Sequence, residues 1–104
     1  MRPGRLLFAF ILMVWGIVPA RAETIQVTID KLVFSPAEIR AKVGDTVEWI
    51  NKDPLAHTAT VRGDWDVMIA AGTSARLVLS KPGTFEYYCR FHPNMTGRIT
   101  VTAK

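Results

Sequence analysis

The stretch "TFEYYCRFHPNMTGRITV" (residues 84–101) decides the fold of this 104-residue chain. It contains the only cysteine, Cys89, one of the two histidines, His92, and Met95, each three residues after the last. The runs on either side alternate apolar and polar residues, as the strands of a half-buried sheet do. A thiol, an imidazole and a thioether between two such strands indicate a metal site at one end of a β-sheet.

The sequence after residue 22 consists of short alternating runs separated by turns that contain Gly, Pro or Asp. This pattern predicts an all-β fold, a two-sheet antiparallel Greek-key sandwich of about seven or eight strands. Residues 66–72 are predicted to form either a short helical turn or an irregular edge strand, with Met68 in the core. The predicted strands span residues 24–29, 38–43, 46–51, 57–62, 74–80, 84–89 and 97–103.

Residues 1–22 are predicted to be a signal peptide. Two arginines precede an unbroken apolar run at residues 6–18, and the small-residue cleavage motif "ARA" follows it. The run is shorter than the roughly 20 residues of a membrane-spanning helix, and an uncleaved anchor is the alternative. Cleavage after Ala22 would place one domain, residues 23–104, in the periplasm without a membrane attachment.

The predicted mature domain is close to neutral. Three basic residues lie in the leader, so residues 23–104 carry ten basic and nine acidic side chains, a net charge of +1. The sequence has no basic stripe of the kind that favours nucleic acid. We therefore expect a domain that binds no nucleic acid, and we expect it to be a monomer.

The lone cysteine of an exported domain needs an explanation. It cannot form an internal disulfide, so Cys89 is buried and inert, paired with another chain, or bound to a metal. A domain of this size has a small hydrophobic core, and a bound metal could stabilise it.

The candidate ligands are two imidazoles, a thiol and a thioether. Two imidazoles and a thiolate, with a weak axial thioether, form the blue (type 1) copper site of electron-transfer proteins. Thiolate and thioether suit Cu(I), imidazole suits both copper states, and structural zinc sites are built from other ligands than methionine. Four protein ligands leave no open position for a substrate, so the donor set predicts one copper ion and an electron carrier, not an enzyme. These four residues are His57, Cys89, His92 and Met95.

Two other functions stay open. One is a periplasmic copper-trafficking or copper-resistance protein, whose sites are usually rich in methionine; the predicted mature domain has only Met68 and Met95. The other is a metal-free sandwich that serves as a binding module.

The segments "YYCRFHPNMTGRITV" and "VGDTVEWINKDPLAHTATV" resemble the cupredoxins, and the C-x-x-H-x-x-M spacing is most similar to that of the amicyanins. The resemblance covers nearly all of residues 23–104. It implies an eight-stranded Greek-key sandwich, a periplasmic one-electron carrier and a type 1 copper ion held by the four candidate ligands. Two residues depart from the family pattern. Thr58 stands where the family usually has Asn, and Phe91 stands where amicyanins tend to have Pro.

The departures predict how the cysteine sulfur is hydrogen-bonded. The resemblance implies a first donor in the backbone N–H of Thr58. Phe91 has an N–H that Pro lacks, and we expect it to be a second donor to the Cys89 sulfur. The Thr58 hydroxyl is shorter than an Asn side chain, so we expect it to tie the two ligand loops together less firmly.

Apolar residues flank the candidate ligands. Around His92 they form either an exposed patch for docking of a redox partner or ordinary loop packing. Four aromatic residues elsewhere are predicted to be core residues and not electron relays. The patch candidates are Pro54, Leu55, Phe91 and Pro93, and the core aromatics are Trp49, Trp65, Phe85 and Tyr87.

Overall fold

The computed structural model describes residues 21–104, so nearly all of the predicted signal peptide lies outside the described residues. The described part contains strands and turns only, and the predicted all-β sandwich is confirmed. No helix in it is long and apolar enough to cross a membrane. The strands are β1 (Thr24–Asp30), β2 (Val33–Ser35), β3 (Glu38–Lys42), β4 (Thr46–Asn51), β5 (His57–Val61), β6 (Trp65–Ile69), β7 (Ser74–Val78), β8 (Gly83–Cys89) and β9 (His92–Thr102).

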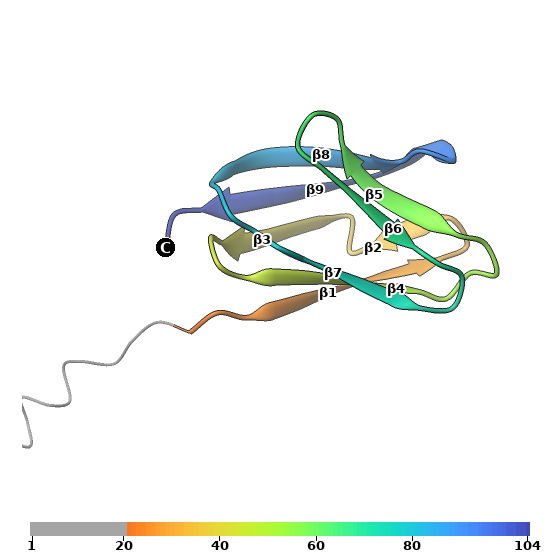
Figure 1. Cartoon of the computed structure of the whole chain (residues 1–104), viewed down its shortest axis with the longest axis horizontal. Helices are drawn as coiled ribbons and strands as arrows, with labels where there is room; N and C mark the ends of the chain where they lie inside the picture. Colours follow the sequence, from red (N-terminus) through yellow and green to blue (C-terminus); the bar gives the residue numbers. More distant parts are fainter. Residues whose placement is uncertain (1–20) are drawn as a thin grey trace, which may run out of the picture.

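Two sheets pack face to face (Figure 1). One has the strand order β2-β1-β4-β7, and the other has the order β3-β9-β8-β5-β6. Most neighbouring strands are antiparallel, as predicted, but β1 pairs with β4 and β3 pairs with β9 in parallel. Between β1 and β4 the chain passes through β3 in the opposite sheet. It therefore returns to the first sheet running in its original direction.

Three details differ from the sequence prediction. The strand β2 has three residues, too few for a period-2 pattern to be recognised, and it raises the described total to nine strands. Residues 66–72 contribute to the edge strand β6 and not to a helical turn. Met68 is 53% exposed, so its predicted core position is wrong. Alternation along β6 turns Trp65, Val67 and Ile69 inward and Met68 outward.

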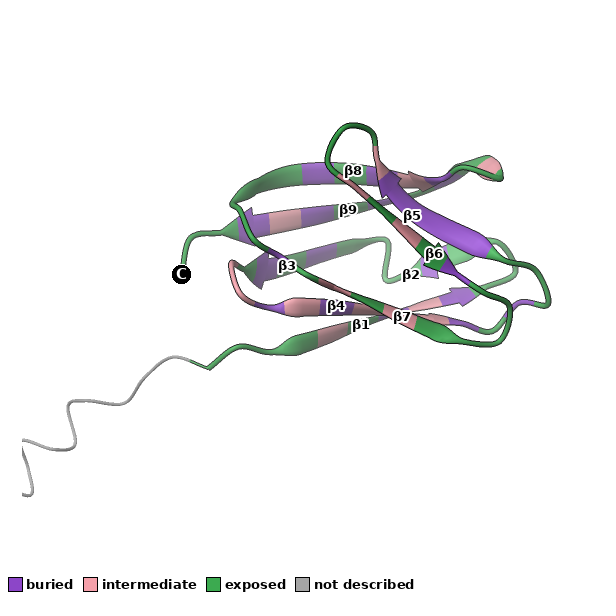
Figure 2. Cartoon of the chain, in the orientation of Figure 1, coloured by how far each residue is buried: buried purple, intermediate pink, exposed green. Residues whose placement is uncertain are grey.

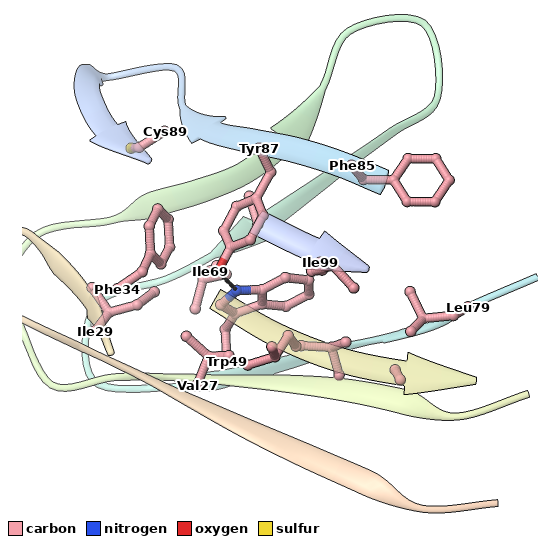
Figure 3. Packing of buried hydrophobic residues seen from close by; sticks show 14 of the residues in the cluster. Val27, Ile29, Phe34, Trp49, Ile69, Leu79, Phe85, Tyr87, Cys89 and Ile99 are labelled. Atoms are coloured by element: carbon pink, nitrogen blue, oxygen red, sulfur yellow. Dashed lines mark hydrogen bonds between the residues drawn. The ribbon is translucent and has the colours of Figure 1, made fainter. Parts of the chain in front are cut away.

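The buried segments of the two sheets face each other (Figure 2), and aromatic side chains lie at the centre of the core between them (Figure 3). Trp49 and Tyr87 are almost fully buried, and the Trp49 Nε1–H donates to Tyr87 Oη over 3.2 Å. The Phe34 ring lies edge-on to Tyr87 with centroids 4.7 Å apart. Burial raises the pKa of Tyr87 to about 12. Phe85 is also buried, so three of the four predicted core aromatics are confirmed as core residues. The fourth, Trp65, is partly buried and packs against this cluster.

Gly97 makes room for the Tyr87 ring. The two residues face each other directly across β8 and β9. A methyl group on Gly97 would lie 2.5 Å from Tyr87 Oη and 2.7 Å from its Cε2, inside van der Waals contact. Glycine at this position therefore lets Tyr87 reach across the sandwich to Trp49.

The two ends of the sandwich differ in role. The described chain begins and ends at one end, while the β8–β9 turn and the β4–β5 loop lie together at the opposite end (Figure 1). The sequence places three of the candidate ligands at or next to that turn and the fourth, His57, directly after that loop. The topology thus gathers them at the end of the molecule away from the chain termini.

Asp45 organises the end with the termini. Its buried carboxylate accepts the backbone N–H groups of Glu23 and Lys42, each over 2.9 Å, and its carbonyl accepts the N–H of Leu79. The bond from Glu23, followed by that from Lys42, lowers the pKa of Asp45 below its ordinary value. One ionised side chain therefore joins the starts of β1 and β4 to the end of β3.

We expect Asp45→Asn to lower the free energy of unfolding by about 1–2 kcal/mol at pH 7, because an amide keeps only one of the two acceptors. A carboxylate with a depressed folded-state pKa stabilises the fold above its unfolded pKa of about 3.9, and this contribution is lost as pH falls through the folded value. Urea denaturation should therefore show a difference between wild type and variant at pH 7 that shrinks below about pH 4. The exposed Asp30→Asn is the control, and a difference independent of pH would contradict this account.

Candidate metal centre

Three of the predicted ligands converge in the structure. Cys89 Sγ lies 3.6 Å from His57 Nδ1 and 3.8 Å from His92 Nδ1. The three donor atoms all lie within 4.8 Å of one another, a spacing that suits one metal ion. His57 and Cys89 are fully buried and His92 is half-buried. The site is thus closed on the core side and reaches the surface through one imidazole.

A break in strand pairing creates this arrangement. Along β8 and β9, Tyr88 pairs with Thr96, but the next residue, Cys89, pairs with His92. Residues 93–95 on β9 are therefore left out of the ladder as a bulge. The bulge brings His92 opposite the cysteine, which a regular hairpin would not do.

Met95, the fourth predicted ligand, ends the bulge. Its side chain is buried, with 4% exposure, and it lines the same surface groove as His92, Phe91 and Leu32. Met95 thus lies near His92, at the end of the bulge in β9. Its role as an axial ligand stays a prediction.

Asp53 orients His57. Asp53 Oδ2 lies 2.8 Å from His57 Nε2, so this nitrogen carries the proton that it donates to the carboxylate, and Nδ1 is the nitrogen that faces Cys89 Sγ. The carboxylate also accepts the backbone N–H groups of Lys31 and Leu32. The Leu32 bond first, then the His57 and Lys31 bonds, hold the pKa of Asp53 below its usual value against the opposing effect of burial.

Asn51 shapes the loop that carries Asp53 and His57. Its side-chain Nδ2 donates to the carbonyl of Leu55 over 2.8 Å and to that of Ile69 over 3.2 Å. Its Oδ1 accepts the N–H of Asp53 over 2.9 Å. Neither Asn51 nor Asp53 was predicted from the sequence. The available signal was a pair of polar residues, two apart, at the end of a predicted strand and in the loop before His57.

Thr58 hydrogen-bonds to the ligand loop twice. Its backbone N–H donates to Cys89 Sγ over 3.4 Å, as predicted. Its hydroxyl accepts the N–H of Arg90 over 2.9 Å, so the side-chain tie between the two loops is made although Thr replaces Asn. The second predicted donor is not found. Within residues 21–104, Phe91 lies in the turn between the paired Cys89 and His92, and its N–H makes no hydrogen bond to the sulfur.

The apolar residues predicted to surround His92 are exposed. Leu55 is 49% and Phe91 is 47% exposed, and both prolines of the predicted patch lie at the surface. The structure adds Leu32, 43% exposed, from the β1–β2 turn. Exposure on this scale argues against loop packing as the reason for these residues.

Comparisons with known proteins agree with this geometry. The profile of the cupredoxin-like domain matches residues 5–101. The chain belongs to the cupredoxin-like family. The match covers both sheets and all three converging donor residues.

The chain is similar in sequence to amicyanins and plastocyanins. Amicyanin of Paracoccus denitrificans is 34% identical over 84 residues, an alignment that covers 74% of this chain and 64% of that protein. Plastocyanin of Prochlorothrix hollandica is 31% identical over 100 residues, covering 80% of this chain and 76% of that protein. The chain thus spans somewhat less than two thirds of the length of the Paracoccus protein.

The fold of the cupredoxin also matches solved structures. A reduced, Cu(I) form of an amicyanin variant at pH 4, in which a proline is replaced by glycine, superposes with a TM-score of 0.65. It is 32% identical in sequence, and the match covers 83% of this chain and 87% of that one.

We expect Asp53→Asn to weaken metal binding by roughly tenfold, because an outer partner that fixes a ligand histidine typically contributes that much. The amide presents an NH₂ where Oδ2 now accepts both the His57 proton and the Leu32 N–H. Competition of the metal-free protein with a chromophoric chelator for a divalent metal measures the change. Asp30→Asn should bind like the wild type, and equal affinities for all three proteins would contradict the role given to Asp53.

Proposed function

We propose that the protein is a blue (type 1) copper protein that carries single electrons between protein partners. One observation carries the proposal: a buried thiol and two imidazole Nδ1 atoms converge within 4.8 Å. A thiolate with two imidazoles is the donor set of blue-copper sites, and this chain belongs to the family in which amicyanins and plastocyanins are found.

The donors of this chain fit copper. His57, Cys89 and His92 would hold the ion, and Met95 would supply the weak axial thioether that distinguishes blue-copper sites. Soft sulfur ligands stabilise Cu(I) while the imidazoles serve both oxidation states. Bound copper would supply one-electron chemistry by cycling between Cu(II) and Cu(I).

The surrounding residues would serve a carrier and not an enzyme. Asp53 and Thr58 hold two of the ligands in place, so the site needs little rearrangement when its charge changes. With four protein donors no ligand position is left for a substrate. Partners would dock transiently on the exposed patch around half-buried His92, formed by Pro54, Leu55, Phe91 and Pro93 and extended by Leu32.

We also propose that the mature protein begins at Glu23 and works in the periplasm. Both backbone groups of Glu23 make hydrogen bonds within the fold. Its N–H donates to the Asp45 carboxylate, and its carbonyl accepts the N–H of Thr46 over 2.8 Å. Arg21 and Ala22 are exposed. Cleavage after Ala22 would leave every strand intact.

Mass spectrometry of the exported protein should show Glu23 as its first residue. Cleavage at that bond is expected because the motif "ARA" ends there and β1 begins one residue later. A chain that retains Met1 in the exported pool would identify residues 1–22 as an anchor and refute the proposed maturation.

The copper proposal is tested by titrating the purified domain with Cu(II) and recording its visible spectrum. We expect one equivalent to bind with an intense blue charge-transfer band that ascorbate bleaches reversibly. Cys89→Ser should remain folded and lose the band, because the thiolate is its origin. Met68→Leu, which removes the exposed sulfur of β6, is the control and should keep the band.

Other spectra separate the alternatives. A pale spectrum without the intense band would contradict the carrier and favour copper trafficking. No binding at all would favour a metal-free binding module. A band that survives in Cys89→Ser would exclude this residue as the ligand.

A further inference from the structure

A closed ring of hydrogen bonds lies behind the cysteine, outside the set of candidate ligands. It links β5, the edge strand β6 and the β8–β9 turn. The Arg90 N–H donates to Thr58 Oγ1 over 2.9 Å, and Thr58 Oγ1 lies 2.9 Å from Thr60 Oγ1. Thr60 Oγ1 lies 2.6 Å from Asp66 Oδ1. The Arg90 side chain closes the ring, with Nε 3.0 Å from Oδ1 and Nη2 3.2 Å from Oδ2 of Asp66.

We propose that Asp66 is a positioning residue for the metal centre: through Thr60 and Thr58 it fixes the distance between the Thr58 N–H and the Cys89 sulfur, and thereby the reduction potential. This inference rests on the proposed copper function. Asp66, Thr60 and Arg90 are residues that the family resemblance did not single out. Asp66 reaches the sulfur only through the two threonines and Arg90.

The chemistry of the groups in the ring determines which hydroxyl donates and which accepts in each hydrogen bond. Bonds from Arg90 and then Thr60 lower the pKa of Asp66, so its carboxylate is ionised near neutral pH and can only accept. The single Thr60 proton must therefore point to Asp66. Thr60 Oγ1 is then free to accept the Thr58 proton, and Thr58 Oγ1 accepts the Arg90 N–H.

This direction gives Asp66 control over Thr58. Thr58 and Thr60 are buried, with exposures of 0% and 5%, so neither hydroxyl can exchange its partner for water at low cost. If the carboxylate is removed, the Thr60 proton is free to turn toward Thr58. The Thr58 hydroxyl then loses its acceptor, and the hydrogen bond from the Arg90 backbone N–H to Thr58 Oγ1 is weakened.

Stability is a minor part of the role of Asp66. The Asp66 and Arg90 side chains are 51% and 40% exposed, and exposed ion pairs contribute little to stability. Asp66 matters more for the position of the ligand turn than for stability. The hydrogen bond from the Thr58 N–H to Cys89 Sγ is already long at 3.4 Å, so its strength is sensitive to that position. A small displacement of the ligand turn from β5 would weaken it further.

Weakening this bond has a defined electronic consequence. An N–H donor withdraws electron density from a thiolate ligand and favours the reduced metal, so its loss lowers the reduction potential. The lost negative charge of Asp66 would act in the opposite direction. A nearby carboxylate outside the ring therefore serves as the control for charge.

The experiment compares two pairs of variants. Thr60→Val removes the hydroxyl at constant shape, while Thr60→Ser keeps it. Asp66→Ala removes the anchor, while Asp64→Ala removes a carboxylate two residues away that pairs with Lys81 and lies outside the ring. The reduction potential of the copper-loaded proteins is measured by redox titration. Amide hydrogen exchange of Arg90 is measured by NMR in the metal-free proteins.

We expect Thr60→Val and Asp66→Ala to lower the potential and to speed Arg90 exchange roughly 3- to 10-fold, since the amide hydrogen bond is loosened. Thr60→Ser and Asp64→Ala should match the wild type in exchange and should not lower the potential. Unchanged potentials in Thr60→Val and Asp66→Ala, in a wild-type protein that is blue, would overturn this inference alone. A wild-type protein that binds no copper would overturn the proposed function and the inference with it.

Discussion

The hydrogen bond from the Thr58 N–H to Cys89 Sγ is the contact on which the candidate metal centre depends. The strands β5 and β8 pair at Thr60 and Tyr88, and immediately beyond that pair the sulfur takes the place of a backbone acceptor. The regular ladder thus ends where the ligands begin. On its other edge β8 pairs with β9, and the register of this pairing shifts after Tyr88 so that His92 lies opposite Cys89. Cys89 is therefore the point at which β8 contacts both β5 and β9. A thiol that a uniform sheet would bury as an inert core residue is left facing two imidazoles.

Buried polar groups hold the rest of the site. His57 is fully buried, and its orientation depends on Asp53, which in turn depends on Asn51 and on two N–H groups of the β1–β2 turn. An unpaired member of such a network would cost more than the net gain from a single hydrogen bond. In the described part of the chain every buried side-chain nitrogen and oxygen has a partner. Because the buried polar side chains around the site are all hydrogen-bonded, we expect the site to be rigid. The aromatic core that contains Trp49 and Tyr87 packs between the sheets that carry it.

The sequence alone predicted the parts of the structure that follow local rules. Period-2 alternation identified most strands, and the spacing of Cys89, His92 and Met95 pointed to the β8–β9 turn as a candidate metal site. His57 was chosen as a candidate because it begins a β-branched run after a polar loop, and the structure places it beside Cys89 and His92. Register could not be predicted, since the slip after Tyr88 depends on pairing between strands. The outward direction of Met68 depended on which of the two predicted structures residues 66–72 adopt, because only a strand alternates its side chains between the two faces. Asp53 and Asn51 were missed because their hydrogen bonds depend on how the β4–β5 loop is folded, which leaves no periodic signal. The Phe91 N–H was wrongly assigned to the sulfur because the backbone geometry of the β8–β9 turn cannot be deduced from residue types alone.

We propose that the fold holds His57, Cys89 and His92 in place before copper binds. Crystal structures of the metal-free and copper-loaded domain would test this proposal. We expect His57, Cys89 and His92 to keep their rotamers, Asp53 to stay bonded to His57, and the Thr58 N–H to stay on Cys89 Sγ in both structures. A metal-free structure in which the β8–β9 turn moves away from β5, or in which His57 turns away from Asp53, would contradict it.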